Sequence, residues 1–270
     1  MSGCEVVVTE SGALAMRDAV TGETMHPGVG PRVEAEALYV APSRLRARLA
    51  EGGAAPLVLL DVGLGAGSNA VAALRAAHAL PESARRLTVV SFEHALAPLA
   101  LALRPEHAEA FGFDATSVMA ATQLLAHGVY EDARVRWELR LGDLRSGLRE
   151  QRPASADVVF WDPFSPRADP TLWSEQTFGV LRRACREGAT VHTYSAAPAT
   201  RVAMLVAGFF VGLGPRSGRK HKPTTIAATT LSTLAEPLRS AWRAQLGRSR
   251  VPLPEEALAV LAVHPQFVGG

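Results

Sequence analysis

A glycine-rich turn near residue 60 carries residue types that can bind a ligand. The apolar stretch 57–60 leads into Asp61, and Gly63, Gly65 and Gly67 then alternate with other residues before an Ala/Leu-rich segment. Because glycine has no Cβ, this backbone can adopt unusual dihedral angles and approach a ligand closely. The carboxylate of Asp61 would repel a pyrophosphate but can lie near a cationic amino group. The turn therefore favours a ligand that bears an amino group, unless the glycines only pack a helix on a strand.

Two more acidic residues end predicted strands. Glu93 follows the apolar segment 87–92, where a carboxylate can accept two hydrogen bonds from a ribose diol. Its alternative role is a solvated charge. Asp143 follows the alternating segment 134–141, and there it can cap the next helix.

A fourth acidic residue has a different chemical role. Asp162 follows the apolar segment 157–161 and begins the sequence Asp-Pro-Phe-Ser-Pro. Its carboxylate can accept a hydrogen bond from an amine, orient that amine and receive its proton. Phe164 can pack against a base or a cofactor. The alternative is that the two prolines only form turns.

Alternating strands and helices must position these groups. The predicted strands are 57–60, 87–92, 134–141, 157–161, 189–194, 209–213 and 225–230. The predicted helices are 34–49, 68–80, 95–103, 106–127, 144–150, 170–186 and 199–206. This alternation predicts an α/β fold with a seven-stranded, mostly parallel sheet covered by helices on both faces. The last two strands have no helix between them and should be antiparallel. The four carboxylates then meet at the carboxyl edge of the sheet.

We expect three segments along the chain. Residues 1–50 form an N-terminal extension with short β segments and a helix that packs on the core. Residues 51–235 form the main domain, and residues 236–270 form a helix and a tail that contains prolines.

The pattern Asp61-x-Gly63-x-Gly65-x-Gly67 resembles the first motif of class I S-adenosylmethionine (SAM)-dependent methyltransferases. The resemblance implies a Rossmann-like fold and SAM as the cofactor. It places Asn69, Glu93 and Asp162 among the cofactor contacts, together with the motif residues. By the same resemblance, Asp143 faces the adenine.

Further segments resemble the MnmC-type methyltransferases in their order and spacing, over about residues 10–230. The matching pieces are Glu23, Met25-His26, 34–39, 91–93, Gly142-Asp143, 162–166, Asp169-Pro170-x-x-Trp173, 193–196 and 218–220. Pro163 replaces the glycine of that family, and 221–223 reads His-Lys-Pro where an acidic residue is usual.

The resemblance implies methylation of an aminomethyl group on the wobble uridine of tRNA. Some members continue into a flavin-dependent oxidase domain. This chain has no room for one, so we expect a stand-alone methyltransferase. Asp162 and Phe164 are the expected catalytic residues.

Five residues are candidates for substrate contacts. Trp173 and Tyr194 are expected in the pocket, and His26 lies either at the acceptor site or in a packed turn. Arg219 and Lys220 belong to the basic loop 216–222, which is either a phosphate contact or an ordinary solvated loop.

Composition fits a cytoplasmic globular protein. Hydrophobic residues make up 48% and charged residues 20%, with a net charge of +2, which permits an RNA partner without demanding one. The two cysteines, Cys4 and Cys185, have neither disulfide nor metal spacing. We expect no metal, no signal peptide and no membrane span, and the sequence leaves the oligomeric state open.

Other functions fit part of the pattern. One enzyme alternative methylates a different amine, and another uses the same fold to transfer an aminopropyl group from decarboxylated SAM, although only Asp162 suggests a polyamine site. A binding module for SAM or RNA without catalysis is an alternative of another class. NAD-dependent reduction is disfavoured by Asp61.

Overall fold

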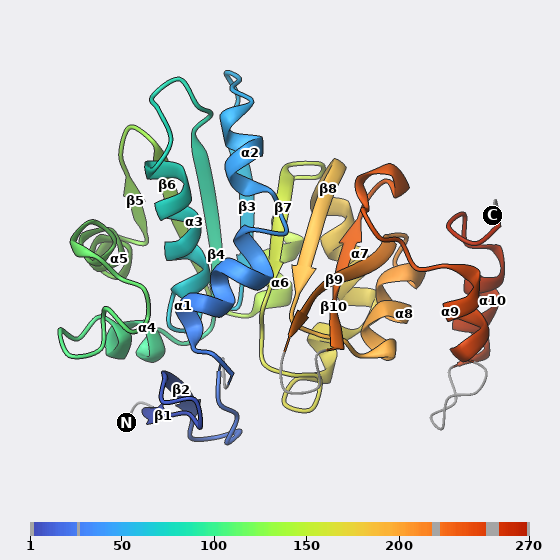
Figure 1. The fold of residues 1–270 in the computed structure, drawn as a ribbon, viewed down its shortest axis with the longest axis horizontal. Coiled ribbons are helices and arrows are strands. Elements are labelled where there is room, and N and C mark those ends of the chain that lie inside the picture. Colours follow the sequence, from blue (N-terminus) through green and yellow to red (C-terminus); the bar gives the residue numbers. More distant parts are fainter. Residues whose placement is uncertain (1–2, 26–27, 218–221, 247–253, 269–270) are drawn as a thin grey trace.

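The computed structural model describes residues 3–25, 28–217, 222–246 and 254–268. Its centre is an eight-stranded sheet, and helices cover both faces of this sheet (Figure 1). The strand order is β5-β6-β4-β3-β7-β8-β10-β9. The strands of this sheet are β3 (Leu57–Val62), β4 (Leu87–Glu93), β5 (Val129–Glu131), β6 (Val135–Leu141), β7 (Ala156–Trp161), β8 (Cys185–Thr193), β9 (Phe210–Ser217) and β10 (Lys222–Ala228).

The predicted fold class is confirmed, and the strand count is corrected from seven to eight. The added strand is β5, three residues that pair antiparallel with β6 at one edge. The five central strands are parallel, and β10 pairs antiparallel with both β8 and β9, as the missing crossover helix predicted.

The helices follow the predicted alternation with corrected bounds. They are α1 (Pro31–Glu34), η1 (Ala35–Val40), α2 (Leu45–Ala50), α3 (Ser68–His78), α4 (Ala97–Ala102), α5 (Ala115–His127), α6 (Leu144–Arg149), η2 (Pro170–Trp173), α7 (Glu175–Ala184), α8 (Pro198–Val206), η3 (Leu231–Thr233), α9 (Ser240–Leu246) and α10 (Glu255–Val263). The predicted helix 106–127 is wrong in its first part, because α5 begins only after Asp114, whose carboxylate caps it. The segment after 236 contains two helices rather than one.

The predicted helix 34–49 is divided into three parts. Its middle part, η1, is a π-helix, in which the Ala41 N–H reaches the Glu36 carbonyl at 2.9 Å. Pro42 has no N–H with which to continue the ladder, and Arg44 has a left-handed φ of 54°. The N-terminal extension also contains a separate hairpin of β1 (Cys4–Val8) and β2 (Leu14–Asp18).

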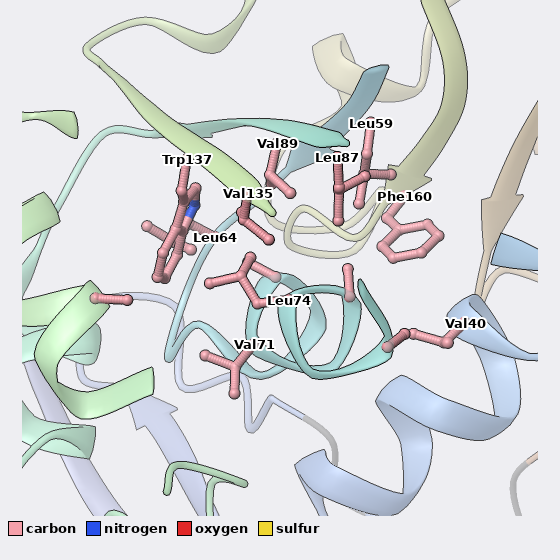
Figure 2. Close-up of a cluster of buried hydrophobic side chains, with 14 of the residues drawn as sticks. Val40, Leu59, Leu64, Val71, Leu74, Leu87, Val89, Val135, Trp137 and Phe160 are labelled. Atoms are coloured by element: carbon pink, nitrogen blue, oxygen red, sulfur yellow. The ribbon is translucent and has the colours of Figure 1, made fainter. Parts of the chain in front are cut away.

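The core lies in two layers, one on each face of the sheet. Leu59 of β3 and Phe160 of β7 point to the face that α3 covers, as Figure 2 shows, whereas Leu60 and Trp161 belong to the layer under α6, α7 and α8. This alternation follows from the two-residue period of a strand. Strands buried on both faces explain the continuous apolar runs in the sequence.

The C-terminal segment closes one edge of the sheet. The carboxamide of Gln266 accepts a hydrogen bond from the Val211 N–H of β9 at 2.8 Å and donates to the Val211 carbonyl at 2.7 Å. The Leu238 N–H also bonds to the Val211 carbonyl, and the Leu213 N–H bonds to the Glu236 carbonyl. Backbone groups of an edge strand that would otherwise face solvent are thus paired.

Candidate active site

The glycine turn connects β3 to α3 at the carboxyl edge of the sheet. The N–H groups of Gly63 and Leu64 donate to the Phe92 carbonyl at 3.1 and 3.2 Å, so the turn is fixed to the end of β4. Gly63 has a φ of 89°, and a Cβ there would lie 2.6 Å from the carbonyl oxygen of Asp162. Only glycine lets the turn lie this close to the loop that follows β7.

The other two glycines of the motif also have positive φ. Gly67, with φ of 88°, precedes the first turn of α3, and a Cβ there would lie 2.9 Å from a methyl carbon of Leu99. A Cβ on Gly65 would meet the sulfur of Met25 at 3.2 Å. The glycines of the motif are therefore required both by the close packing of neighbouring segments and by the positive φ of their own backbone.

Asp61 is completely buried at the end of β3. Its Oδ2 accepts a hydrogen bond of 2.7 Å from Ser91, whose hydroxyl in turn accepts one of 2.8 Å from the Trp137 ring N–H. Its Oδ1 has no partner in the described part of the chain. Burial raises the pKa of Asp61 to about 7, and the charges of Asp162 and Glu93 raise it too, against the Ser91 hydrogen bond. A cationic ligand nearby would relieve this cost, so the site fits the positively charged SAM.

Glu93 joins the end of β4 to the glycine turn. Its Oε2 accepts a hydrogen bond of 2.8 Å from the Gly65 N–H, and its Oε1 accepts bonds from the N–H groups of His94 and Ala95 at 2.8 and 3.1 Å. Burial opposes ionisation, but the hydrogen bonds from His94, Gly65 and Ala95 outweigh it and hold the pKa of Glu93 below its usual range. Glu93 is therefore held ionised at this edge, and its contact with a ribose stays a prediction.

Asp143 caps α6. Its Oδ1 accepts hydrogen bonds of 2.9 Å from both the N–H and the hydroxyl of Ser146, and these bonds lower its pKa. The preceding Gly142 N–H bonds to the Glu93 carbonyl at 2.8 Å. The predicted capping role is confirmed, and the predicted contact with adenine stays a prediction.

Asp162 lies between the cofactor motif and the loop of residues 162–169, which we call the acceptor loop. Its Oδ2 accepts a hydrogen bond of 2.7 Å from the side-chain N–H of Asn69, the second residue of α3. The Asp162 N–H bonds to the Val62 carbonyl at 2.9 Å. Asp162, the residue predicted to orient the amine, therefore contacts β3 and α3, the two elements on either side of the glycine turn.

The acceptor loop is held by three distant side chains. The ring N–H of Trp173 donates to the Phe164 carbonyl at 2.8 Å, and the Tyr194 hydroxyl donates to the Pro163 carbonyl at 3.1 Å. The Trp173 and Tyr194 rings meet at 5.6 Å with an interplanar angle of 78°. Glu23 accepts hydrogen bonds from both the N–H and the hydroxyl of Ser165. In this structure the two aromatic side chains support the loop that carries half-buried Phe164.

The described candidates form one connected group. Hydrogen bonds join Gly65 to Glu93, Asn69 to Asp162, and Trp173 and Tyr194 to the loop of Phe164, and Gly63 lies against Asp162. Asp61 and Asp143 lie at the ends of β3 and β6 at the same edge of the sheet. His26, Arg219 and Lys220 lie outside the described residues. Sequence reasoning gave Glu23, Tyr39 and Ser91 no role beyond a motif match. Only the motif match marked Glu23, since its partner Ser165 is 142 residues away.

A groove runs along α3 from the glycine turn. It has a volume of about 550 Å³ and is bordered by Arg32, Arg46, Arg75 and Ser68. Arg46 forms a bidentate ion pair with Glu36, with N–O distances of 2.6 and 2.9 Å. Neither Arg32 nor Arg75 forms an ion pair with an acidic side chain within the described residues, and both lie against Gly112. The charge of Arg75 helps to lower the pKa of Asp114, so the positive charge of the groove is partly compensated.

The described residues also bear on other kinds of site. They contain no group of three or more His, Cys, Asp or Glu side chains that could hold a metal ion. None of the helices formed by residues 3–25, 28–217, 222–246 and 254–268 is long and apolar enough to cross a membrane.

Comparison with known proteins places this geometry in a family. Residues 105–229 match the model of an S-adenosyl-L-methionine-dependent methyltransferase family. The tRNA 5-methylaminomethyl-2-thiouridine biosynthesis bifunctional protein MnmC of Methylibium petroleiphilum is 32% identical over 86% of this chain and 36% of its own length. MnmC of Ralstonia nicotianae is 33% identical over 75% of this chain and 30% of its own length. The chain thus spans about a third of these relatives.

Solved structures give the same result. The crystal structure of MNMC2 from Aquifex aeolicus matches with a TM-score of 0.74 and 27% identity, over 97% of this chain and 83% of that one. Spermidine synthase from Thermotoga maritima matches with a TM-score of 0.50 and 15% identity, over 97% of this chain and 80% of that one. The second match shows only a shared fold.

The fold and the site define a class I methyltransferase that uses SAM as its cofactor. Within this class, the chain is similar to the MnmC proteins over most of its own length and about a third of theirs.

Proposed function

We propose that this protein methylates the amine of an aminomethyl group on the wobble uridine of tRNA. The position of Asp162 carries the proposal, because its carboxylate is fixed by Asn69 within contact of the glycine turn. The names of the relatives supply the substrate class, since MnmC takes part in 5-methylaminomethyl-2-thiouridine biosynthesis in tRNA.

The reaction needs alignment more than covalent catalysis. SAM would supply a methyl group on a positively charged sulfur, and this sulfur would leave as a neutral thioether as the amine nitrogen attacks the methyl carbon in line. Asp61 and Glu93 would hold the cofactor from the ends of β3 and β4. Asp162 would accept a hydrogen bond from the neutral amine, direct its lone pair and take the proton released when the new N–C bond forms.

An RNA partner is consistent with the groove along α3. Arg32 and Arg75 could each contact a phosphate, and the groove begins at Ser68, directly after the glycine turn. A strand of RNA lying there would pass the mouth of the site. A tRNA substrate also places the working protein in the cytoplasm.

The test is methyl transfer to defined tRNA. Purified protein, isotopically labelled SAM and tRNA that carries 5-aminomethyluridine should give 5-methylaminomethyluridine, identified by mass spectrometry of the digested nucleosides. Asp162→Asn should reduce the rate by about 10²–10⁴-fold without weakening SAM binding. Asp114→Asn, which removes a carboxylate from the cap of α5, is the control and should keep nearly full activity.

Two results would overturn the proposal. Equal activity of Asp162→Asn and the wild type would remove the role of this carboxylate. Transfer from decarboxylated SAM to a polyamine, with none from SAM to tRNA, would assign the aminopropyl reaction instead.

A further inference from the structure

Tyr39 occupies an unusual position near Asp162. It lies on η1, the π-helix, and such wide turns are rare and occur often at functional sites. Its ring packs on Phe160 of β7, with ring centroids 5.3 Å apart at 54°, and its side chain is almost completely buried. Since Phe160 precedes Asp162 by two residues, the ring lies beside the strand that delivers this carboxylate.

Among the described residues, no hydrogen bond of ordinary geometry reaches the Tyr39 hydroxyl, although the Asp162 carboxylate is near enough to affect the pKa of Tyr39. A buried hydroxyl without a partner costs free energy, and such a group in a native structure calls for an explanation. Burial raises the pKa of Tyr39 well above its ordinary value, and the nearby charge of Asp162 raises it further. The hydroxyl is therefore a permanent donor close to a carboxylate.

Asp162 already has one donor, the side-chain N–H of Asn69 on Oδ2. The orientation of a carboxylate is set by the donors on each of its two oxygens. A second donor on the other side would fix its plane and therefore the direction of the lone pair that faces the acceptor amine. The Tyr39 hydroxyl is one of the buried side-chain donors without a hydrogen bond of ordinary geometry in the described chain. Asp162 raises its pKa, so this donor lies near the carboxylate.

We propose that Tyr39 is a positioning residue whose hydroxyl donates to the Asp162 carboxylate when the acceptor is bound. Asn69 and Tyr39 then hold this carboxylate from two sides while it orients the amine. This role rests on the proposed function of Asp162 and adds a residue from the N-terminal extension to the acceptor site.

The central variant is Tyr39→Phe, which removes only the hydroxyl. We expect kcat to fall about tenfold, as the loss of one hydrogen bond to a charged group implies. The Kd for SAM should be unchanged, and the melting temperature should be unchanged or higher, because the lost hydroxyl has no hydrogen bond of ordinary geometry in the described part of the chain. A merely structural role would instead lower stability.

Tyr130→Phe is the matched control. Tyr130 is also buried, but its hydroxyl donates to Asp132 at 2.7 Å, far along the chain from the candidate site. This variant should lower the melting temperature and leave kcat unchanged. Tyr39→Phe should therefore lower kcat without lowering the melting temperature, and Tyr130→Phe should do the reverse.

A double-mutant cycle tests whether Tyr39 acts through Asp162. The variant with both Tyr39→Phe and Asp162→Asn should be no slower than Asp162→Asn alone. The proposal is overturned by full kcat in Tyr39→Phe, or by a further tenfold loss in the double variant. A wild type that methylates neither tRNA nor a small amine would instead refute the proposed function, and this role with it.

Discussion

The cofactor side and the acceptor side of the site are built in different ways. On the cofactor side, the glycine turn and Glu93 are joined largely by backbone N–H groups at the ends of two adjacent parallel strands. On the acceptor side, side chains from distant segments hold the acceptor loop: Glu23, Trp173 and Tyr194. The cofactor side therefore depends on the geometry of the sheet, and the acceptor side depends on tertiary packing.

This difference predicts how each side responds to mutation. A change on the cofactor side should alter SAM affinity, because the backbone there shapes the ligand site itself. A change on the acceptor side should alter the rate and spare SAM affinity, because the sheet below the loop stays intact.

Gly63→Ala should have the largest effect, because it disturbs both sides at once. The added Cβ would lie 2.6 Å from the Asp162 carbonyl oxygen, and the residue has a positive φ. We expect SAM affinity to fall at least about 100-fold, corresponding to about 2.7 kcal/mol, when measured by calorimetry. Gly128→Ala also has a positive φ but meets no atom within 4 Å. It should lower only the stability, by about 1–2 kcal/mol, and equal SAM affinity in both variants would contradict the role of the close contact.

Glu23→Ala should affect the acceptor side alone. It removes the two hydrogen bonds to Ser165, so the acceptor loop loses its tie to the N-terminal extension. Hydrogen bonds to a charged group contribute about 1.5–3 kcal/mol, so we expect kcat to fall roughly tenfold, with SAM affinity unchanged. Glu36→Ala breaks an exposed ion pair with Arg46 and serves as the control. A loss of SAM affinity in Glu23→Ala would show that the two sides are not separable.

Asp61 gives the cofactor side a pH dependence. Its pKa is raised from 3.8 to about 7 by burial, so the folded protein binds more protons than the unfolded chain within this window. Stability should therefore fall as pH rises from about 4 to 7, and Asp61→Asn should remove this slope. SAM should bind more tightly as pH rises through 7, because the ionised carboxylate attracts its positive charge. Denaturant unfolding and calorimetry at pH 5 and 8 would check both slopes, and identical slopes in the variant would contradict them.

Arg75→Gln should have the smallest effect, because it removes one contact from the groove outside both sides of the site. We expect a several-fold loss of tRNA affinity and a salt dependence whose logarithmic slope falls by about one, with SAM affinity unchanged. Fluorescence anisotropy over a salt series measures both. Arg152→Gln, an exposed residue at the other end of the sheet, is the control, and an equal loss in both variants would remove the groove from the RNA surface.

Most of the cofactor side could be predicted from the sequence. Apolar and alternating runs identified the strands, and four of them led into Asp61, Glu93, Asp143 and Asp162, so the carboxyl edge of the sheet followed from topology. The raised pKa of Asp61 could not be predicted in the same way, because it depends on the burial of this side chain and on how Ser91 and the neighbouring carboxylates pack around it.

The acceptor side was less accessible to sequence reasoning. The π-helix that places Tyr39 beside Asp162 has no distinctive residue pattern, and the Glu23–Ser165 contact joins residues far apart in the chain. The start of α5 was different, since Asp114 and Ser117 form a capping box that the sequence displays. The three-residue strand β5 is too short for any periodicity to show.

The pairing of Gln266 with β9 has a consequence for association between molecules. A sheet edge with free N–H and carbonyl groups is a template for strand addition by another chain. Here one carboxamide occupies both groups of Val211, as the backbone of a neighbouring strand would. Gln266→Ala would leave the Val211 N–H without this partner, while the Leu238 N–H still bonds to the Val211 carbonyl, so we expect more aggregation under mild heating and no change in activity.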